Sequence, residues 1–377
     1  MPAFPFVGYL HVMDRKALPA AARRIPKEPC SRPGEFVRSP LAEPPSATGP
    51  LTDPFGRRIT YLRLSITESC NFRCTYCHPA EEAGVATLPP AMTGAEIVRL
   101  GSLFVGLGAT KIRLTGGEPT LHPELVPIAE GLCALAPSPE LALSTNGVLL
   151  PRLAPRLREA GVTRVNVSLD AVSRERFRQM TGRDRFDAVR AGIDAALGAG
   201  FLRVKINAVV LRDVNEDQIV PLASLARSLP VDVRFIELMP LSGNGFRPGD
   251  QVTTAEVEKR LGAELELTEV VRETNAGPAR MFHVAGFEGR VGFISPFSLG
   301  FCGDCNRVRV TARGALRLCL LGGGEADLVG RIRSGADDAA LARTVRDALA
   351  GKAERHPLVD PSTAMPSCGT PMWAIGG

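Results

Sequence analysis

Two adjoining stretches, Ile59-Thr-Tyr-Leu-Arg-Leu-Ser-Ile66 and Cys70-Asn-Phe-Arg-Cys74-Thr-Tyr-Cys77, decide how this chain is interpreted. The first reads as a β-strand, and the second places three cysteines on one short loop directly after it. Three thiolates can ligate three irons of a cubane iron–sulfur cluster, and the fourth iron stays open to a reactant. The sequence therefore predicts a site for chemistry at the end of this strand.

Composition restricts the class of protein. The chain has 377 residues, of which 45% are apolar and 23% charged, which predicts a globular protein with one large domain and a smaller second one. No apolar run approaches the roughly 20 residues that span a bilayer. Met1 to Phe6 lack the basic start and apolar core of a signal peptide, so we expect a cytoplasmic protein. Nine cysteines, six of them in two tight groups, indicate metal ligation in a reducing compartment.

The charge pattern argues against nucleic acid as a partner. The net charge of +5 is not gathered into a lysine run, and one tryptophan and three tyrosines supply few stacking platforms. A small anionic substrate fits this balance better.

Three regions follow one another along the chain. Residues 1–50 contain ten of the 31 prolines and are predicted to be a flexible extension. Residues 51–245 alternate strands and helices, which predicts parallel strands in a partial (β/α)6 TIM-like barrel. Residues 246–377 change to shorter strands, and we expect a smaller α+β domain there with a second cysteine group.

The predicted elements of the barrel region alternate regularly. The predicted strands are 59–66, 110–115, 140–145, 163–169, 202–210 and 231–238. The predicted helices are 93–106, 122–136, 151–160, 185–199 and 215–228, and in the last region strands are predicted at 264–271, 279–285, 290–295 and 306–311, with a helix near 336–350.

Polar or glycine-rich motifs follow several of these strands. They are Thr115-Gly-Gly-Glu-Pro119, Ser144-Thr-Asn-Gly147, Ser168-Leu-Asp170 and Glu237-Leu-Met-Pro240. Carboxyl ends of barrel strands carry the reactive groups, so these motifs and the cysteine loop predict one shared cavity. We interpret Gly116 and Gly117 as places where a cofactor lies against backbone, with an ordinary turn as the alternative.

The second cysteine group is Cys302-Gly-Asp-Cys305 followed by Cys319, and thirteen residues, Asn306 to Leu318, separate Cys305 from Cys319. On spacing alone it resembles a zinc site, but a fourth ligand is missing and His283 or Cys368 would have to supply it. Beside the first group, a second three-cysteine cluster is the better interpretation. Zinc on Cys70, Cys74, Cys77 and His78 is the alternative for the first group, and Cys30, Cys133 and Cys368 are interpreted as bystanders.

Seven cations lie in or beside the predicted strands: Arg63, Lys111, Arg113, Lys205, Arg234, Arg307 and Arg309. Buried positive charges are unfavourable unless anions pair with them, so this number of cations inside a barrel indicates an anionic ligand. Arg307 and Arg309 alternate on one strand face and could grip a polyphosphate, although pairing with nearby carboxylates is the alternative.

The motif Cys-x3-Cys-x2-Cys, with an aromatic residue before its last cysteine, resembles the radical S-adenosylmethionine superfamily, and Gly116-Gly-Glu-Pro119 strengthens the match. Residues 50–377 resemble the GTP 3′,8-cyclase family, which opens molybdenum cofactor biosynthesis. That resemblance rests on Gly56-Arg57, Arg63-Leu-Ser65, Lys111-Ile-Arg113, Thr181-Gly-Arg183, Cys302 to Arg309 and the terminal Gly376-Gly377.

The resemblance implies two 4Fe-4S clusters, on Cys70, Cys74 and Cys77 and on Cys302, Cys305 and Cys319. It implies S-adenosylmethionine bound by Tyr76, Gly117, Ser168 and Met239, and GTP bound by Arg63, Arg113, Ser144, Lys205, Arg307 and Arg309. Arg63, Gly376 and Gly377 would assist the reaction. A flavodoxin or ferredoxin would donate electrons, and the product would pass to cyclic pyranopterin monophosphate synthase; a homodimer is one alternative for the assembly.

Three departures from the family pattern are mild: His78 replaces Met, Ser144 replaces Thr, and Glu68-Ser69 replaces an acidic–basic pair. Two other functions remain open at this point. One is a radical enzyme that modifies peptides, and the other is a zinc-stabilised binding module without catalysis.

Overall fold

The computed structural model describes residues 49–77, 90–239, 248–271, 277–321, 325–356 and 372–375. A single sheet of twelve strands organises them, in the order β12-β11-β10-β1-β2-β3-β4-β5-β6-β9-β8-β7. The eight central strands are parallel: β10 (Arg307–Val310), β1 (Tyr61–Ser65), β2 (Lys111–Thr115), β3 (Glu140–Thr145), β4 (Arg164–Ser168), β5 (Arg203–Val210), β6 (Val231–Glu237) and β9 (Arg290–Ile294). The six predicted barrel strands and their parallel pairing are thereby confirmed.

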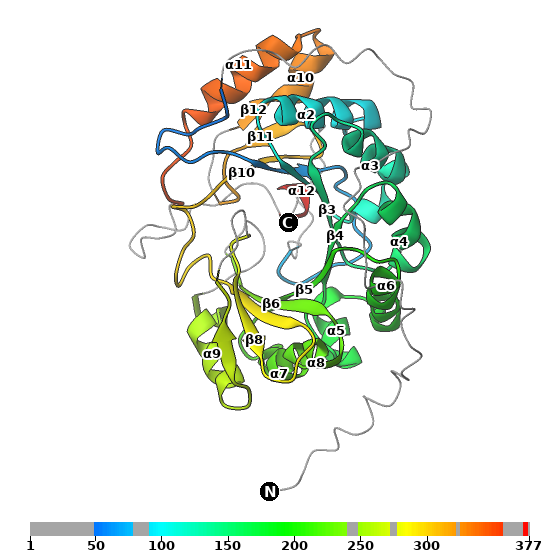
Figure 1. Cartoon of the computed structure of the whole chain (residues 1–377), viewed down its shortest axis with the longest axis vertical. Coiled ribbons are helices and arrows are strands. Elements are labelled where there is room, and N and C mark those ends of the chain that lie inside the picture. The colour runs from blue at the N-terminus through cyan, green and yellow to red at the C-terminus, as the bar shows by residue number, and fades with distance from the viewer. Residues whose placement is uncertain are drawn as a thin grey trace, which may run out of the picture.

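Helices connect the parallel strands and cover one face of the sheet (Figure 1). These are α2 (Gly94–Gly106), α3 (Leu125–Cys133), α4 (Leu150–Glu159), α5 (Arg174–Thr181), α6 (Phe186–Gly198), α7 (Ile219–Ala223) and α8 (Leu225–Ser228), with 3-10 turns η2 (Pro119–Leu121) and η3 (Glu216–Gln218). The prediction missed α5 because Arg-Glu-Arg-Phe-Arg-Gln-Met-Thr has too few apolar residues to show a helical period.

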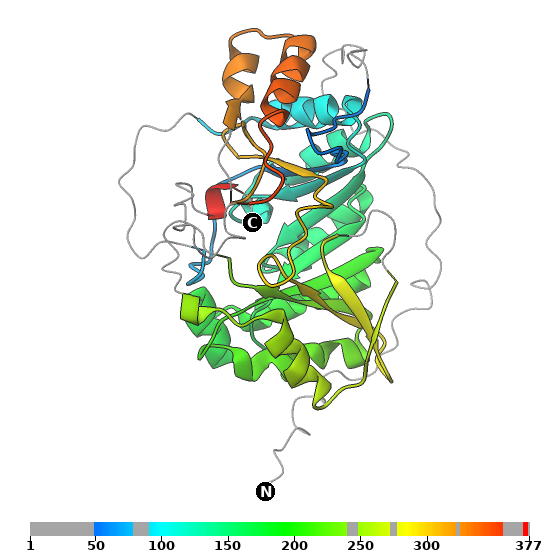
Figure 2. The ribbon, with the colours of Figure 1, turned by 90° about the vertical axis from the view of Figure 1, so that its left-hand side faces the viewer.

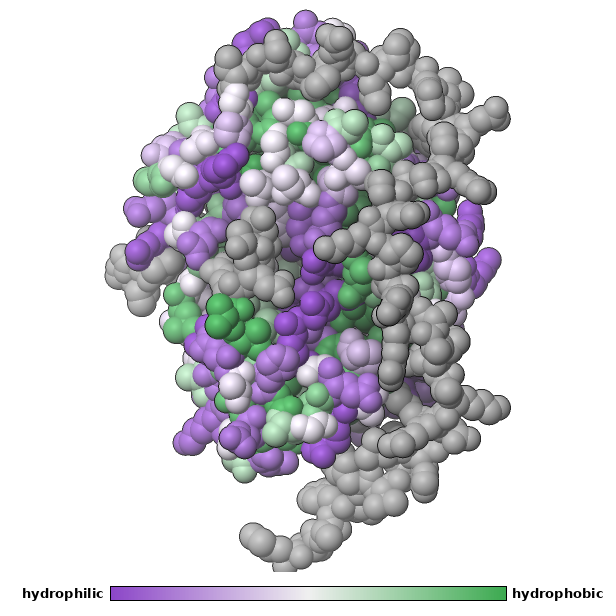
Figure 3. All heavy atoms as spheres, viewed as in Figure 1, coloured by the Kyte–Doolittle hydropathy of each residue, from purple (hydrophilic) through white to green (hydrophobic). Residues whose placement is uncertain are grey.

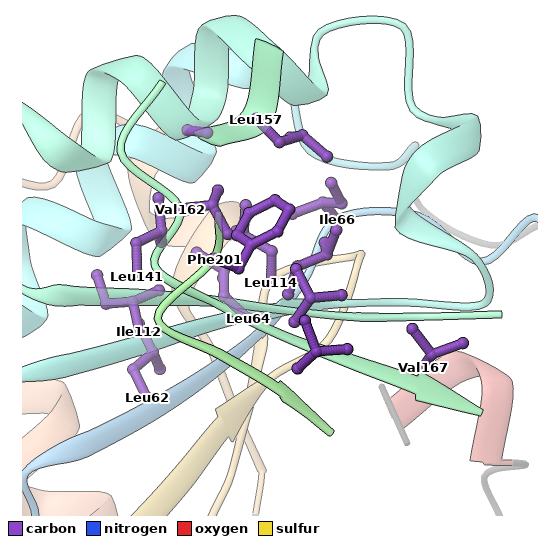
Figure 4. Packing of buried hydrophobic residues seen from close by; sticks show 14 of the residues in the cluster. Leu62, Leu64, Ile66, Ile112, Leu114, Leu141, Leu157, Val162, Val167 and Phe201 are labelled. Carbon is purple, nitrogen blue, oxygen red and sulfur yellow. The ribbon is translucent and has the colours of Figure 1, made fainter. Parts of the chain in front are cut away.

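Alternate residues of each strand face opposite sides, and this decides what the sheet can do. Leu62 and Leu64 of β1 and Ile112 and Leu114 of β2 pack under the helices in the core (Figure 4). Residues of the opposite parity, such as Arg63, therefore face away from the helices. We call that side the inner face.

The C-terminal strands join both edges of the barrel sheet. β9 pairs with β6, and β10 pairs with β1, although about 240 residues separate Arg307 from Tyr61 in sequence. Antiparallel strands extend each edge further: β8 (Arg280–Val284) and β7 (Leu267–Glu269) beside β9, and β11 (Ala315–Arg317) and β12 (Glu325–Asp327) beside β10. The predicted boundary at 245/246 falls among residues 240–247, which lie outside the described residues.

The remaining helices pack around these edges. They are η4 (Pro248–Asp250), α9 (Thr254–Gly262), α10 (Leu328–Arg333) and α11 (Asp338–Leu349), whereas the short helix α12 (Met372–Ile375) lies inside the ring of strands (Figure 1). Figure 2 shows α10 and α11 together at one end of the molecule and α9 at the other. None of the helices described here has the length and apolarity to pass through a bilayer. A band of hydrophilic residues crosses the middle of the face seen in Figure 3.

Candidate active site

The first cysteine loop is held against the loop that follows β2. Gly117 N donates to Thr67 O at 2.7 Å, and Glu118 N donates to Ser69 O at 2.7 Å. On its other side, Arg73 N donates to Thr181 O at 2.9 Å, where α5 ends. The cysteine loop is therefore clamped between two backbone segments that the sequence singled out separately, Gly116 to Pro119 and Thr181 to Arg183.

Gly116 and Gly117 are needed for this clamp. A Cβ on Gly117 would lie 2.4 Å from Ser69 O and 2.5 Å from Glu68 O, and one on Gly116 would lie 2.5 Å from Thr67 O. Contacts that short do not occur, so a side chain at either position would push the cysteine loop away. The glycines thus serve close approach between two loops, a role that the sequence interpretation did not include.

Glu118 connects the loops after β2 and β3. Its buried carboxylate accepts hydrogen bonds from Thr120 N at 3.0 Å, Thr145 Oγ1 at 2.7 Å and Asn146 N at 2.6 Å. Burial raises the pKa of Glu118, although these donors favour the carboxylate. Asn146 in turn donates through Nδ2 to Asn71 Oδ1 at 2.6 Å. Glu118 therefore supports the cysteine loop indirectly, through Asn146.

The three thiols of the first group suit a polynuclear cation. Burial raises the pKa of Cys74 well above its usual value, and Asp170 and the neighbouring Cys77 and Cys70 raise it further. Thiols that suppress one another's ionisation become thiolates only when positive charge arrives, as iron supplies it. Among the described residues, no three His, Cys, Asp or Glu side chains converge closely enough to hold a single metal ion. Three thiols are the donor set that a cubane with one open iron requires, and His78, the fourth ligand of the zinc alternative, lies outside the described residues.

The predicted cofactor-binding residues come from the carboxyl ends of different strands. Gly117 follows β2, Ser168 is the exposed last residue of β4, and Met239 follows β6. Tyr76 lies on the cysteine loop and donates its hydroxyl to Asp170 Oδ2 at 2.9 Å. Asp170, just beyond β4, is buried, and burial raises its pKa to about 6.

The second cysteine group lies at the opposite end of the same strands. Cys305 precedes β10, whose first residue Arg307 is level with Tyr61 at the start of β1. β11 runs antiparallel to β10, which brings Cys319 back to that end. Four residue steps along β1, about 13 Å, thus separate the levels at which the two groups are attached. The position of the second group at this end depends on the long-range pairing of β10 with β1, which local sequence patterns do not reveal.

Two cations anchor the second group. Arg57 Nη1 donates to Cys302 O at 2.7 Å, and buried Lys352 donates to Leu318 O, beside Cys319. Burial alone would raise the pKa of the Cys305 thiol, but the charges of Arg307 and Lys352 and hydrogen bonds from Arg307 lower it. The Cys305 thiol therefore has a lower pKa than the buried Cys74 thiol of the first group.

The inner face between the two groups is strongly cationic. On the described strands β1 to β6, β9 and β10 it carries ten arginines or lysines and two carboxylates, Glu140 and Asp232. The strand register aligns Arg63 with Arg113 on one side and Arg309 on the other. All seven cations noted in the sequence face this side, as strand parity requires.

The two carboxylates, Glu140 and Asp232, neutralise part of the positive charge of the inner face. Glu140 pairs with Lys111 at 2.5 Å and Arg164 at 3.0 Å, and Asp232 pairs with Arg290 at 2.9 Å and lies 4.0 Å from Lys205. Lys111 therefore pairs with a nearby carboxylate, which was the alternative to binding an anionic ligand, and Lys205 does so in part. Burial, followed by the charge of Arg234, still lowers the pKa of Lys205 to about 6.

The remaining cations repel one another. Burial and the neighbouring Arg309, Arg113 and Arg307 lower the pKa of Arg63 well below its usual range, and burial and Arg307 lower that of Arg309 to about 10. Arg113 Nη1 donates to Ser144 Oγ at 3.3 Å, and Arg307 stacks 4.8 Å from the ring centre of Phe301. A polyanion on the inner face would relieve this repulsion.

Sequence reasoning missed several residues that shape the site: Arg57, Tyr61, Asp170, Asp232 and Lys352. Arg57, Tyr61 and Asp170 lie inside motifs that the sequence analysis quoted, so the sequence did mark their neighbourhoods. Lys352 had no such signal, because nothing near it in sequence marks a buried cation.

Gly376, Gly377 and His78 lie outside the described residues. The preceding helix α12 has buried Ala374 and Ile375 and lies inside the ring of strands in Figure 1.

Comparison with known proteins agrees with this geometry. Residues 64–226 match the Radical SAM superfamily, and residues 231–358 match the family described as Molybdenum Cofactor Synthesis C. A protein named GTP 3′,8-cyclase from Ectopseudomonas mendocina is 44% identical over 312 residues, which cover 82% of this chain and 94% of that protein.

Longer relatives match as well. Molybdenum cofactor biosynthesis protein 1 of Homo sapiens is 41% identical over 340 residues, covering 90% of this chain and 53% of its own length. Protein moc-5 of Caenorhabditis elegans is 40% identical over 329 residues, covering 85% of this chain and 54% of its own. The chain thus spans about half the length of these two relatives.

The fold is also similar to a solved structure. Streptococcus suis SuiB bound to S-adenosylmethionine superimposes with a TM-score of 0.52 at 12% identity, covering 76% of this chain and 67% of SuiB. That likeness concerns the fold alone. With the sequence relatives, it leads to one conclusion: the chain belongs to the GTP 3′,8-cyclase family of the radical S-adenosylmethionine superfamily.

Proposed function

We propose that this chain converts GTP to 3′,8-cyclo-7,8-dihydro-GTP, the first step of molybdenum cofactor biosynthesis. One observation carries the proposal: two groups of three cysteines lie at opposite ends of the inner face. That face carries enough positive charge to bind a triphosphate. The name and 44% identity of the Ectopseudomonas mendocina relative support it.

The first cysteine group and its surroundings would hold a 4Fe-4S cluster and S-adenosylmethionine. When bound, these supply a 5′-deoxyadenosyl radical. Tyr76, Gly117, Ser168 and Met239 would line the cofactor, since they come from the loop after β1 and the carboxyl ends of β2, β4 and β6. Their task is to orient it and to exclude water.

GTP would lie along the inner face between the groups. Arg63, Arg113, Lys205, Arg307 and Arg309 would bind it by charge-assisted hydrogen bonds, and Ser144 would position Arg113 as well as the nucleotide. The second group, Cys302, Cys305 and Cys319, would hold a 4Fe-4S cluster whose open iron binds guanine. Arg63, at the centre of this face, would also help to quench the product radical, and Gly376-Gly377 would reach into the active site.

Several further assignments follow from the same proposal. Electrons would come from a flavodoxin or ferredoxin, and the product would pass to cyclic pyranopterin monophosphate synthase. We also propose that the protein acts in the cytoplasm and forms a homodimer.

The deciding experiment uses anaerobically purified, iron- and sulfide-reconstituted protein with GTP, S-adenosylmethionine and dithionite. Mass spectrometry should detect 5′-deoxyadenosine and a cyclised nucleotide in equal amounts. The Cys302→Ala variant serves as the control and should give 5′-deoxyadenosine without cyclisation. If 5′-deoxyadenosine forms with candidate peptides and never with GTP, the chain is instead a peptide-modifying enzyme.

A further inference from the structure

The segment Lys352–His356, which follows α11, contacts the chain directly beside Cys305 and Cys319 and is joined to Cys302 through Arg57. We call it the 352–356 strap. Lys352 Nζ donates to Leu318 O, next to Cys319, and to Arg307 O at 3.3 Å, on the strand that follows Cys305. Its far end is fixed by His356 Nε2, which lies 3.1 Å from Pro296 O.

Arg57 connects the strap to the third cysteine. Its Nη1 lies 2.7 Å from Cys302 O and 2.6 Å from Glu354 O, and its Nη2 donates to Ala353 O at 2.7 Å. Asp53 fixes this guanidinium from the other side. Lys352 and Arg57 therefore join the loop that bears Cys302 and Cys305, and the segment that bears Cys319, to the same five residues.

Lys352 is buried without an ion-pair partner among the residues that the structure describes. The residue is only 4% exposed, and both acceptors named above are neutral backbone carbonyls. Within the described part of the chain, no carboxylate forms an ion pair with Lys352. Burying an ammonium without an anion costs several kcal/mol. A cubane held by three thiolates carries net negative charge and would remove that cost.

We propose that Lys352 is a positioning residue for the second cluster: it joins the Cys305 and Cys319 loops, and its ammonium compensates the charge of the bound cluster. This inference rests on the proposed function, because it requires a cluster at the second group. It assigns a role to a residue outside the set that the proposed function gives to GTP and S-adenosylmethionine. Second-shell partners of this kind set both the retention and the potential of a metal site.

The test compares three full-length variants after anaerobic reconstitution. Lys352→Met removes the charge and the donors, Lys352→Gln keeps N–H donors without the charge, and Lys259→Met is the matched control on the exposed surface of α9. Iron and acid-labile sulfide are measured per chain, without substrate. The potential of the second cluster is then followed on the electron paramagnetic resonance signal that changes when GTP is added.

We expect wild type and Lys259→Met to hold about eight irons per chain and Lys352→Met about four, because the second cluster is lost. Lys352→Gln should retain more iron than Lys352→Met and show a lower second-cluster potential, since a nearby positive charge favours the reduced cluster. Circular dichroism checks folding; if Lys352→Met does not fold, the potential of Lys352→Gln decides.

Full iron content in Lys352→Met, or an unchanged potential in Lys352→Gln, overturns the inference. A different result would overturn the proposed function: wild-type protein that never holds more than about four irons, or whose spectrum does not respond to GTP. The two failures are therefore distinguishable.

Discussion

Tyr61 illustrates how a single residue can organise the cationic inner face. Its ring is buried, its hydroxyl accepts a hydrogen bond from Arg113 Nε, and Lys111 Nζ lies 5.3 Å from the ring centre. Burial alone would raise its pKa, but Arg113, Arg63 and Lys111 lower it to about 7. Tyr61 thus gives three cations a partner that can become an anion while the substrate is absent.

This arrangement predicts a tyrosine that ionises near neutral pH. Phenolate absorbance at 295 nm, followed as a pH difference spectrum, should rise around pH 7 in wild type and not in Tyr61→Phe. GTP should shift this titration to higher pH, because its phosphates would occupy the cations that lower the pKa. Since the folded pKa is below the unfolded value of 10, ionisation stabilises the fold progressively from pH 7 to 10, and this gain is lost as pH falls through 7.

Identical titrations of wild type and Tyr61→Phe would contradict this prediction. Tyr76 does not interfere, because burial and Asp170 raise its pKa well above the usual value.

At the scale of elements, the loop after β2 and the loop after β1 behave as one unit. Two backbone hydrogen bonds of 2.7 Å and the absence of Cβ atoms at Gly116 and Gly117 keep them in contact. Glu118 extends this unit to the loop after β3. The position of three cysteines is therefore decided by residues on two other strands.

Gly117→Ala should displace the cysteine loop. Its Cβ would meet two backbone carbonyl oxygens, which cannot move aside as a flexible side chain would, and such overpacking costs about 1–3 kcal/mol. We expect loss of the first cluster, seen as a fall from about eight to about four irons per chain, with the second cluster retained. Gly198→Ala, where a Cβ meets nothing within 4 Å, is the control and should keep all its iron.

Helix α9 gives a prediction about pH. Thr253 and Glu256 form a capping box at its start, and Glu256 also pairs with Arg212 at 2.7 Å. The hydrogen bond from Thr253 N, followed by that from Arg212, lowers the pKa of Glu256 to about 2. Glu256→Gln should therefore lower the melting temperature at pH 7.

This difference from wild type should persist down to about pH 4.5 and shrink as pH falls toward 2, because wild-type Glu256 then becomes protonated. Glu269→Gln, on exposed β7, provides the control. A pH-independent difference between wild type and Glu256→Gln would show that the carboxylate charge does not matter.

For the whole molecule, local periodicity predicted the strands but not how the two cysteine groups face each other. The runs around Tyr61, Ile112 and Val165 alternate clearly, so β1, β2 and β4 followed from the sequence. The place of Cys305 did not, because it depends on β10 pairing with β1 across about 240 residues. Lys352 became visible only as a buried side chain against Leu318 O, and the role of Gly117 was interpreted as cofactor contact rather than loop contact.

The two cysteine groups should have separable functions. Alanine at Cys70, Cys74 or Cys77 is expected to abolish formation of 5′-deoxyadenosine, whereas alanine at Cys302, Cys305 or Cys319 should spare part of it and stop cyclisation. The buried Cys133, packed near Ser138, offers a matched control, and Cys133→Ser should keep both activities. Normal cyclisation after loss of the second group would refute a role for it in binding guanine.

The joining of β9 to β6 and of β10 to β1 has a consequence for any shortened form of the protein. A chain that stopped after residue 245 would expose two parallel edge strands at once, each with unpaired backbone amides and carbonyls. Such edges recruit other chains, so expression of the N-terminal half alone should yield insoluble aggregates. Co-expressing residues 246–377 as a separate polypeptide should restore solubility, because β10 and β9 would then pair with the exposed edges of β1 and β6.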